Sequence, residues 1–301
     1  MKVTLGGLPQ HVLTRGSAEN PLLLILHGGP GFAGLPLFTT YNAELEKDFH
    51  VVHWDQRGAG RTYTPDTPAA SMTIAQYVAD AVELIDWLTG RYGQEKVHLL
   101  GHSWGGQLGA SVAAKHPDRL HSFIGVAPLV AGIRNERASY AFTLRKATEA
   151  GDTGALRILR EIESRYSGNF RYLDLIVQRG LLAEYGGVTH SDLGALINGV
   201  PADLRDEYFG RALATAQEFC WEHLLPELMA ADLTRTARTI DVPVHVILGR
   251  HDQNTPSELA VEWFELLSAP SKELHWFEES GHLIPHEEPA KFNELVRSIA
   301  R

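Results

Sequence analysis

The chain has 301 residues, of which 44% are hydrophobic and 21% charged, as in ordinary globular proteins. Its formal net charge of −10 argues against nucleic acid or an anionic membrane surface as a partner. No apolar run reaches the roughly 18 residues that span a bilayer, and the first residues lack the apolar segment of a secretion signal. The single cysteine, Cys220, excludes an internal disulfide and fits a reducing compartment. We therefore expect a cytoplasmic protein, and the sequence assigns it no oligomeric state.

Strand-length apolar runs alternate with helical patterns over the first 130 residues. The helix expected over 73–92 has apolar positions at a 3.6-residue period and Thr73 as its N-cap. Strands that alternate with helices indicate βαβ units and a mostly parallel, doubly wound sheet, covered on both faces. The expected strands are residues 22–26, 51–54, 97–100 and 122–126, and the other expected helices are residues 39–47 and 107–116.

This alternation stops in the middle of the chain, where helical patterns follow one another without a strand-like run. We therefore expect an α/β core formed by residues 1–130 and 235–301, and a helical cap formed by residues 131–234. Doubly wound sheets bind ligands at the carboxyl ends of their strands, where such a cap would lie. The cap helices are expected over 139–150, 153–166, 173–185 and 211–229. The later core has expected strands over 242–248 and 273–277 and expected helices over 256–267 and 289–300.

Residues 101–105 read Gly-His-Ser-Trp-Gly and lie between an expected strand and an expected helix. A Gly-x-Ser-x-Gly in this position forms a tight, strained turn that exposes the serine hydroxyl above the sheet. Ser103 is therefore a candidate nucleophile, with the backbone N–H of Trp104 directed at an incoming carbonyl oxygen. The side chain of His102 must point away from that of Ser103, so we expect it to have a packing role. The pentapeptide is short enough to occur by chance, so the rest of the chain must supply its partners.

A serine hydroxyl becomes a good nucleophile only when a base takes its proton and an acid orients the base. Asp252 follows the strand expected over 242–248, and His282 follows the strand expected over 273–277. The chain order Ser, Asp, His is the one found when the serine occupies such a strand-to-helix turn. Asp252 could instead cap the helix that follows it, and His282 competes with the other members of a set of 15 histidines. We predict a catalytic triad of Ser103, Asp252 and His282.

Residues 27–31 read His-Gly-Gly-Pro-Gly and follow the strand expected over 22–26. Two backbone N–H groups aimed at the developing oxyanion stabilise acyl transfer. Because Pro30 has no N–H, Gly29 and Trp104 are the expected donors of an oxyanion hole, although the segment could also be a plain Gly-Pro turn. Phosphate-binding glycine motifs and clustered metal-ligand spacings are absent from the sequence, so we expect no cofactor and no metal site.

Three motifs together carry a resemblance to a known family. The motifs are His-Gly-Gly-Pro-Gly at 27–31, Asp-Gln-Arg-Gly-Ala-Gly-Arg at 55–61 and Gly-His-Ser-Trp-Gly-Gly at 101–106. With these motifs the chain resembles the α/β-hydrolase superfamily and, within it, the proline iminopeptidase-like serine peptidases. The resemblance covers roughly residues 20–130 and 240–301 and implies the α/β-hydrolase fold.

The resemblance also implies roles for individual residues. It implies an oxyanion hole at Gly29 and Trp104, and structural support beneath the site from Asp55 and Arg57. Proline iminopeptidases release an N-terminal proline, and glutamates of their cap hold the free ammonium group, one of them in a Trp-Glu-Gly sequence. Here Trp221-Glu222 is followed by histidine. The candidates for an amine site are Glu184, Glu207, Glu218 and Glu222, each of which could equally lie on a solvated helix face.

These observations predict a serine hydrolase that works through an acyl-enzyme on a small molecule or a short peptide. The resemblance implies cleavage of an N-terminal residue, as by a prolyl aminopeptidase. The alternative is a carboxylesterase or lactonase acting on small acyl esters, with the cap cavity lined by apolar groups such as Phe142, Phe170 and Tyr172. A non-catalytic binding protein of the same fold often lacks a member of the triad, whereas this chain has all three.

Overall fold

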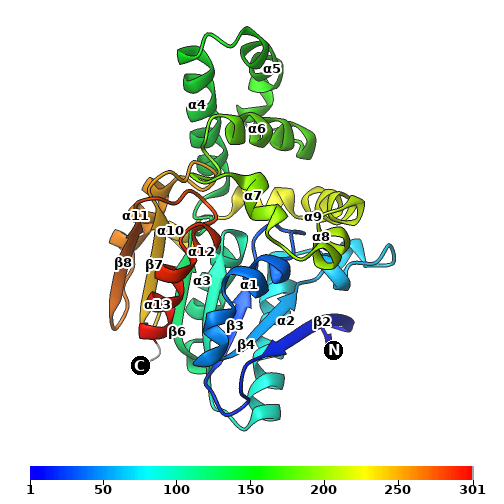
Figure 1. Ribbon diagram of the computed structural model, residues 1–301, viewed down its shortest axis with the longest axis vertical. Coiled ribbons are helices and arrows are strands. Elements are labelled where there is room, and N and C mark those ends of the chain that lie inside the picture. The colour runs from blue at the N-terminus through cyan, green and yellow to red at the C-terminus, as the bar shows by residue number, and fades with distance from the viewer. Residues whose placement is uncertain (168, 300–301) are drawn as a thin grey trace.

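The computed structural model describes residues 1–167 and 169–299 (Figure 1). Within these residues an eight-stranded sheet has the strand order β1-β2-β4-β3-β5-β6-β7-β8. The pairs β1/β2 and β2/β4 are antiparallel, and the other pairs are parallel. The strands are β1 (Lys2–Leu5), β2 (Leu8–Arg15), β3 (Leu22–Leu26), β4 (His50–Asp55), β5 (Val97–His102), β6 (Leu120–Val126), β7 (Val244–Gly249) and β8 (Lys272–Phe277).

The six strands expected from the sequence are all present and lie within two residues of their expected bounds. Strands β1 and β2 were not among the expected elements. Strand β1 has only four residues, and β2 buries the polar side chains of Gln10 and His11, so neither has a clear apolar period. They form an antiparallel hairpin at one edge of the sheet. The strand pairs from β4 to β8 are all parallel, which confirms the mostly parallel α/β fold.

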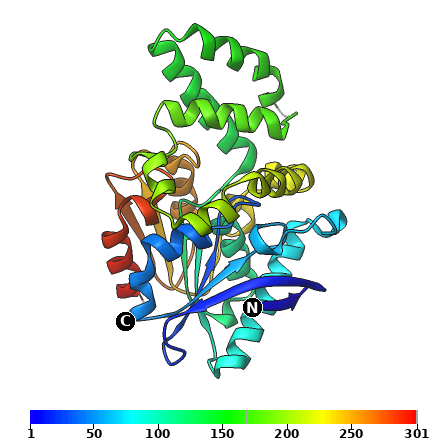
Figure 2. The same ribbon diagram turned by 45° about the vertical axis from the view of Figure 1, so that its right-hand side comes forward.

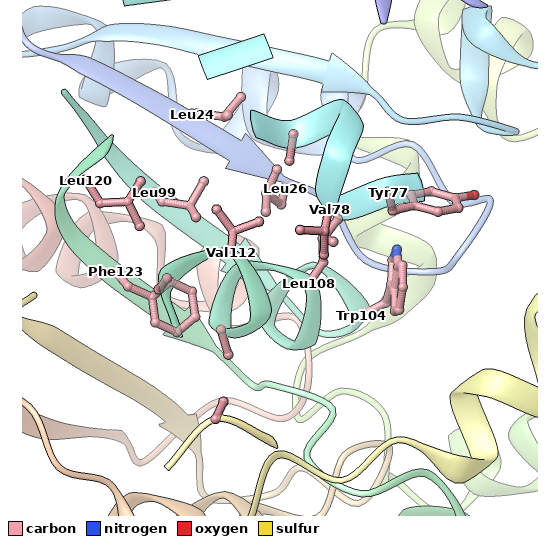
Figure 3. Close-up of a cluster of buried hydrophobic side chains, with 14 of the residues drawn as sticks. Leu24, Leu26, Tyr77, Val78, Leu99, Trp104, Leu108, Val112, Leu120 and Phe123 are labelled. Carbon is pink, nitrogen blue, oxygen red and sulfur yellow. The ribbon is translucent and has the colours of Figure 1, made fainter. Parts of the chain in front are cut away.

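Helices cover both faces of the sheet. On one face α2 (Ile74–Tyr92), α3 (Trp104–Lys115) and α11 (Ser257–Leu266) bury an apolar cluster, part of which Figure 3 shows between the strands and helices α2 and α3. On the other face lie α1 (Leu35–Tyr41), α12 (Ile284–Glu287) and α13 (Pro289–Ile299). The hydroxyl of Thr73 accepts a hydrogen bond from the Gln76 N–H, which confirms Thr73 as the N-cap of α2.

The helix expected over 39–47 is instead divided. Helix α1 ends before Asn42, and a 3₁₀ turn begins at Ala43. The Asn42 side chain donates hydrogen bonds to the Pro285 carbonyl at 2.7 Å and to Asn293 Oδ1 at 2.9 Å, so tertiary contacts interrupt the helical pattern. The 3₁₀ helices are η1 (Ala43–Lys47), η2 (Gly60–Thr62), η3 (Ala69–Ser71), η4 (Pro117–Arg119) and η5 (Ser164–Ser167).

Between β6 and β7 the chain forms helices above the carboxyl ends of the strands (Figures 1 and 2). The upper helices are α4 (Gly132–Glu149), α5 (Thr153–Glu163) and α6 (Tyr172–Glu184), which share an apolar cluster of their own. Nearer the sheet lie α7 (Leu193–Asn198), α8 (Ala202–Tyr208), α9 (Arg211–Ala230) and α10 (Leu233–Thr236). The four expected helices correspond to α4, α5, α6 and α9, whereas α7, α8 and α10 are too short to give a periodic pattern. None of the helices in the described part of the chain has the length and apolar character needed to cross a bilayer.

Two buried histidines make the fold sensitive to acid. Burial, together with the charge of Arg15, lowers the pKa of His53 to about 4. Burial and the neighbouring His282 lower the pKa of His102 to about 3. An unfolded histidine titrates near pH 6.5, so below that pH the unfolded chain binds protons that the folded chain does not. Each group therefore removes up to about 1.4 kcal/mol of stability per pH unit as the pH falls from about 6.5.

We expect the free energy of unfolding, measured with urea, to fall by about 4 kcal/mol between pH 7 and pH 5 through these two histidines. Neither ring nitrogen of His53 has a hydrogen-bond partner among the described residues, so leucine can replace it without leaving another polar atom unpaired. In His53→Leu the decrease in the free energy of unfolding between pH 7 and pH 5 should be smaller by about 2 kcal/mol. His190→Leu is the control, because the His190 side chain is 43% exposed. An unchanged pH dependence in His53→Leu would contradict the assignment.

Candidate active site

Ser103 occupies a strained turn between β5 and α3. Its φ of 59° and ψ of −120° lie in a region that residues other than glycine rarely adopt. The flanking glycines are required by close backbone contacts. A Cβ on Gly101 would lie 2.1 Å from the Gly105 carbonyl oxygen, and one on Gly105 would lie 2.1 Å from the Leu26 carbonyl oxygen. The local sequence therefore permits the turn that presents the Ser103 hydroxyl.

The structure brings Ser103, His282 and Asp252 together, each from the loop after a different strand. His282 Nε2 lies 3.0 Å from Ser103 Oγ, and His282 Nδ1 lies 2.9 Å from Asp252 Oδ2. All three side chains are buried. Because a carboxylate only accepts hydrogen bonds, Nδ1 carries the imidazole proton and Nε2 is free to accept from the serine hydroxyl. This geometry is suited to proton removal from Ser103.

The carboxylate of Asp252 is fixed by the loop in which it lies. Its Oδ1 accepts the N–H groups of Asn254 at 2.8 Å and Thr255 at 2.9 Å. The Thr255 hydroxyl, which sequence reasoning did not single out, lies 2.9 Å from Asp252 Oδ2 and 3.0 Å from His282 Nδ1. Helix α11 has Pro256 as its N-cap and no side-chain cap, so Asp252 does not serve as the helix cap considered as the alternative.

His102 supports the loop that carries His282. Its Nε2 lies 2.9 Å from the His282 carbonyl oxygen, to which it donates, and the centroids of the two rings are 4.9 Å apart. With its pKa lowered to about 3, mainly by burial, His102 stays neutral beside His282. It therefore has the packing role expected for it and holds the His282 backbone in place.

Gln56 connects the two segments expected to form the oxyanion hole. Its side-chain amide donates to the His27 carbonyl at 3.0 Å, and its Oε1 accepts the indole N–H of Trp104, also at 3.0 Å. The Gln56 backbone N–H donates to His27 Nε2 at 3.1 Å, which requires a neutral imidazole, and burial lowers the pKa of His27 accordingly. Gly29 has a φ of 116°, and a Cβ on Gly28 would lie 3.1 Å from Ser103 Cβ. The glycine segment therefore lies against the serine turn.

Asp55 and Arg57 connect other elements of the fold. Arg57 Nε and Nη2 donate to the two oxygens of Asp80 on α2, at 2.9 and 3.0 Å, in a buried ion pair. Asp55 Oδ2 accepts the Tyr208 hydroxyl at 2.9 Å and the Arg61 N–H at 3.0 Å. Asp55 thus joins helix α8 to the sheet.

A cavity of about 360 Å³ lies between the serine turn and helices α4, α6, α7 and α9. Ser103, His282, Gly28 and Gly29 line one side of it. Its other walls are mostly apolar, and they include Leu129, Leu175, Ile176, Ile197 and Trp221. Such a concave, largely apolar site with a few convergent polar groups is typical of small-molecule binding.

None of the four glutamates expected to bind an amine lines this cavity. All four are exposed, because they lie on the solvent-facing sides of α6, α8 and α9. The carboxylate of Glu207 also forms an ion pair at 2.6 Å with Arg61, a residue of the core. The four glutamates are Glu184, Glu207, Glu218 and Glu222.

The buried carboxylate in the cavity wall is that of Glu136, which is 2% exposed. Both of its oxygens accept from Arg179 Nη2, at 2.7 and 2.9 Å, and Oε1 also accepts from Asn135 Nδ2 at 3.2 Å. Glu136 was missed because the helix expected over 139–150 begins seven residues earlier, at Gly132. The signal that could have found it is its helical spacing from Ser139, Tyr140 and Thr143, which share the buried side of α4.

Comparisons with known proteins agree with this architecture. Residues 21–176 match the family model described as alpha/beta hydrolase fold. The chain is 31% identical to a probable aminopeptidase, YbaC, of Bacillus subtilis, over 100% of this chain and 95% of that protein. It is 25% identical to a proline iminopeptidase of Heyndrickxia coagulans, over 91% of this chain and 88% of that one.

Among solved structures, a proline iminopeptidase of Mycobacterium smegmatis aligns with a TM-score of 0.71 at 25% identity. The alignment covers 99% of this chain and 96% of that chain. These matches confirm the predicted fold class and the resemblance to proline iminopeptidases. The chain belongs to the α/β-hydrolase family.

Proposed function

We propose that the protein is a serine aminopeptidase of the proline iminopeptidase type. The observation that carries this proposal is the hydrogen-bonded array of Ser103, His282 and Asp252, which opens onto a cavity whose wall contains the buried carboxylate of Glu136. The relatives named as an aminopeptidase and a proline iminopeptidase support the same reaction class. Residues 131–234 then act as the cap that selects the substrate. The single cysteine, Cys220, is free and buried, which supports a cytoplasmic location.

In the proposed reaction Ser103 Oγ attacks the carbonyl carbon that follows the substrate's first α-amino group. His282 Nε2 takes the serine proton and then delivers it to the leaving amine, while Asp252 keeps the imidazole in the required tautomer. The backbone N–H groups of Gly29 and Trp104 stabilise the oxyanion. Water, activated by the same imidazole, then hydrolyses the acyl-enzyme.

Glu136 is the proposed acceptor for the free ammonium group of the substrate. It replaces the four exposed glutamates in that role because it is the acidic side chain found in the cavity wall, among the described residues. An ammonium inside an apolar cavity needs a charged, hydrogen-bonded partner to offset its desolvation. The apolar walls around it suit a proline ring or another small apolar side chain.

A second candidate is hydrolysis of small esters or lactones. The observation that favours it is that Arg179 already neutralises Glu136 in a cavity whose walls are otherwise mainly apolar. A neutral acyl substrate would fit such a cavity without requiring a new ion pair. Tyr172 lines the cavity, whereas Phe170 packs in the apolar cluster of the upper helices, so only part of the aromatic set considered from the sequence faces the substrate.

The two candidates are separated by comparing kcat/KM for proline β-naphthylamide and for short p-nitrophenyl esters. We expect Glu136→Gln to lower kcat/KM for the amide by about 10- to 100-fold, the effect of losing a charged hydrogen bond. Ester hydrolysis, which needs no ammonium site, should stay unchanged and reports an intact fold. Glu222→Gln, at an exposed glutamate of the cap, is the matched control. Ester turnover without amide turnover in the wild type would exclude the aminopeptidase assignment.

A further inference from the structure

Strands β7 and β8 carry three potential metal ligands at the edge of the sheet. Glu273 and His275 are two residues apart on β8, so their side chains lie on the same face of the strand. The parallel register pairs His245 of β7 with Glu273, which places all three side chains on one face. Sequence reasoning expected no metal site, because a Glu-x-His pair and a histidine 28 residues before it form no recognised spacing.

The distances between the ligand atoms fit a single ion. His245 Nδ1 lies 3.3 Å from His275 Nε2, and His275 Nε2 lies 3.7 Å from Glu273 Oε2. All three atoms lie within 4.8 Å of one another. Two nitrogen ligands of a tetrahedral zinc ion, each about 2.0 to 2.1 Å from the metal, are separated by about 3.3 Å. The two imidazole nitrogens lie within hydrogen-bond distance of each other, and this separation is also the one that a shared zinc ion requires.

The environment of the two histidines also suits metal binding. The side chains of His245 and His275 are both only partly exposed, and a neutral imidazole offers one ring nitrogen lone pair to a metal ion. The rings lie nearly parallel, with 18° between their planes and 5.5 Å between their centroids. The Glu273 side chain is 63% exposed, which leaves a route for the ion and for a water molecule as fourth ligand.

We propose that His245 Nδ1, His275 Nε2 and a Glu273 carboxylate oxygen form a Zn²⁺ site that joins β8 to β7. Two imidazoles and a carboxylate form a ligand set that zinc binds well. Strand β8 lies at the edge of the sheet and has hydrogen-bonded contact with one neighbouring strand, β7. A metal bridge between the two strands would hold this edge strand, and its role would be structural because Ser103 and its partners lie in loops beyond the other ends of the strands.

The test uses the full chain without a histidine tag, stripped of metal with EDTA. Zinc titration in competition with a chromophoric chelator should give one Zn²⁺ per chain. His275→Ala should lower the affinity by more than about 100-fold, because the loss of groups that only support ligands already costs about 10- to 100-fold. At a free zinc concentration of about 100 times Kd, the Tm of the wild type should rise by about 4 °C, and that of the variant should not.

Two further variants keep the test decisive. Glu273→Gln alters an exposed side chain and should leave the fold intact. It should lower zinc affinity at least tenfold, because even the loss of a group that only supports a metal ligand costs about 10-fold or more. His190→Ala should bind zinc as the wild type does, although His190 stacks on His251 at 4.1 Å and lies 3.2 Å from Glu279. The proposal would be overturned if the wild type binds zinc no more tightly than His275→Ala does. Fluorophosphonate labelling of the metal-free protein reports Ser103 reactivity separately, so a failed zinc site and a failed proposed function are distinguishable.

Discussion

Replacing Ser103 with alanine is expected to lower kcat/KM by about 10⁴-fold or more, whichever substrate the cavity accepts. Without the hydroxyl there is no nucleophile for the acyl-enzyme, and only the oxyanion donors and substrate binding remain. The variant should also lose covalent labelling by a fluorophosphonate probe, which mass spectrometry detects as an adduct on the intact chain. Alanine tolerates the local backbone about as well as serine does, so the fold should be retained.

Ser111→Ala is the matched control for this measurement. Ser111 lies on α3, the helix that follows Ser103, and among the described residues its hydroxyl donates to the Gln107 carbonyl at 3.0 Å. This variant should keep wild-type labelling and turnover. A wild-type protein that does not label, or a Ser103→Ala variant that still does, would argue for a non-catalytic protein of this fold.

Asp252→Asn is expected to lower kcat by about 10⁴-fold through a change in the tautomer of His282. Asp252 Oδ1 is held by the N–H groups of Asn254 and Thr255, so the carbonyl oxygen of an introduced asparagine would remain there. Its NH₂ group would then replace Oδ2 and face His282 Nδ1. That nitrogen would have to accept a hydrogen bond, which moves the imidazole proton to Nε2 and leaves no acceptor for the Ser103 hydroxyl.

Asp192→Asn provides the control for Asp252→Asn, because Asp192 caps helix α7 through the Ala195 N–H and asparagine caps nearly as well. We expect the control to keep wild-type kcat. The Tm of both variants checks that the fold is intact. A kcat for Asp252→Asn within tenfold of the wild type would refute the role assigned to the carboxylate.

The convergence of Ser103, Asp252 and His282 could be predicted because each follows a strand that the sequence already located. The carboxyl ends of parallel strands meet at one edge of a sheet, so residues just after such strands converge wherever they lie in the sequence. The positions of the strands were sufficient for this step, and no knowledge of side-chain packing was needed.

Glu136 and Gln56 could not be predicted in this way because their positions depend on packing between distant elements. The burial of Glu136 results from the contact of α4 with α6, which supplies Arg179. The side chain of Gln56 is held by hydrogen bonds to His27, which lies tens of residues before it, and to Trp104, which lies tens of residues after it. The four exposed glutamates were selected because they are acidic residues of the expected cap, and only the packed structure shows which side of a helix faces the cavity.

The separate apolar cluster of helices α4, α5 and α6, which includes Tyr140 and Leu159, has a consequence for how this protein can diverge. These helices pack mainly on one another and on α9, apart from the clusters on the two faces of the sheet. They nevertheless supply Glu136 and Ile176 to the cavity wall. Mutations that repack this unit can therefore change the shape and charge of the cavity while the hydrogen-bonded array of Ser103, His282 and Asp252 stays intact. Helices α4, α5 and α6 could therefore be exchanged together between homologues, in evolution or by protein engineering.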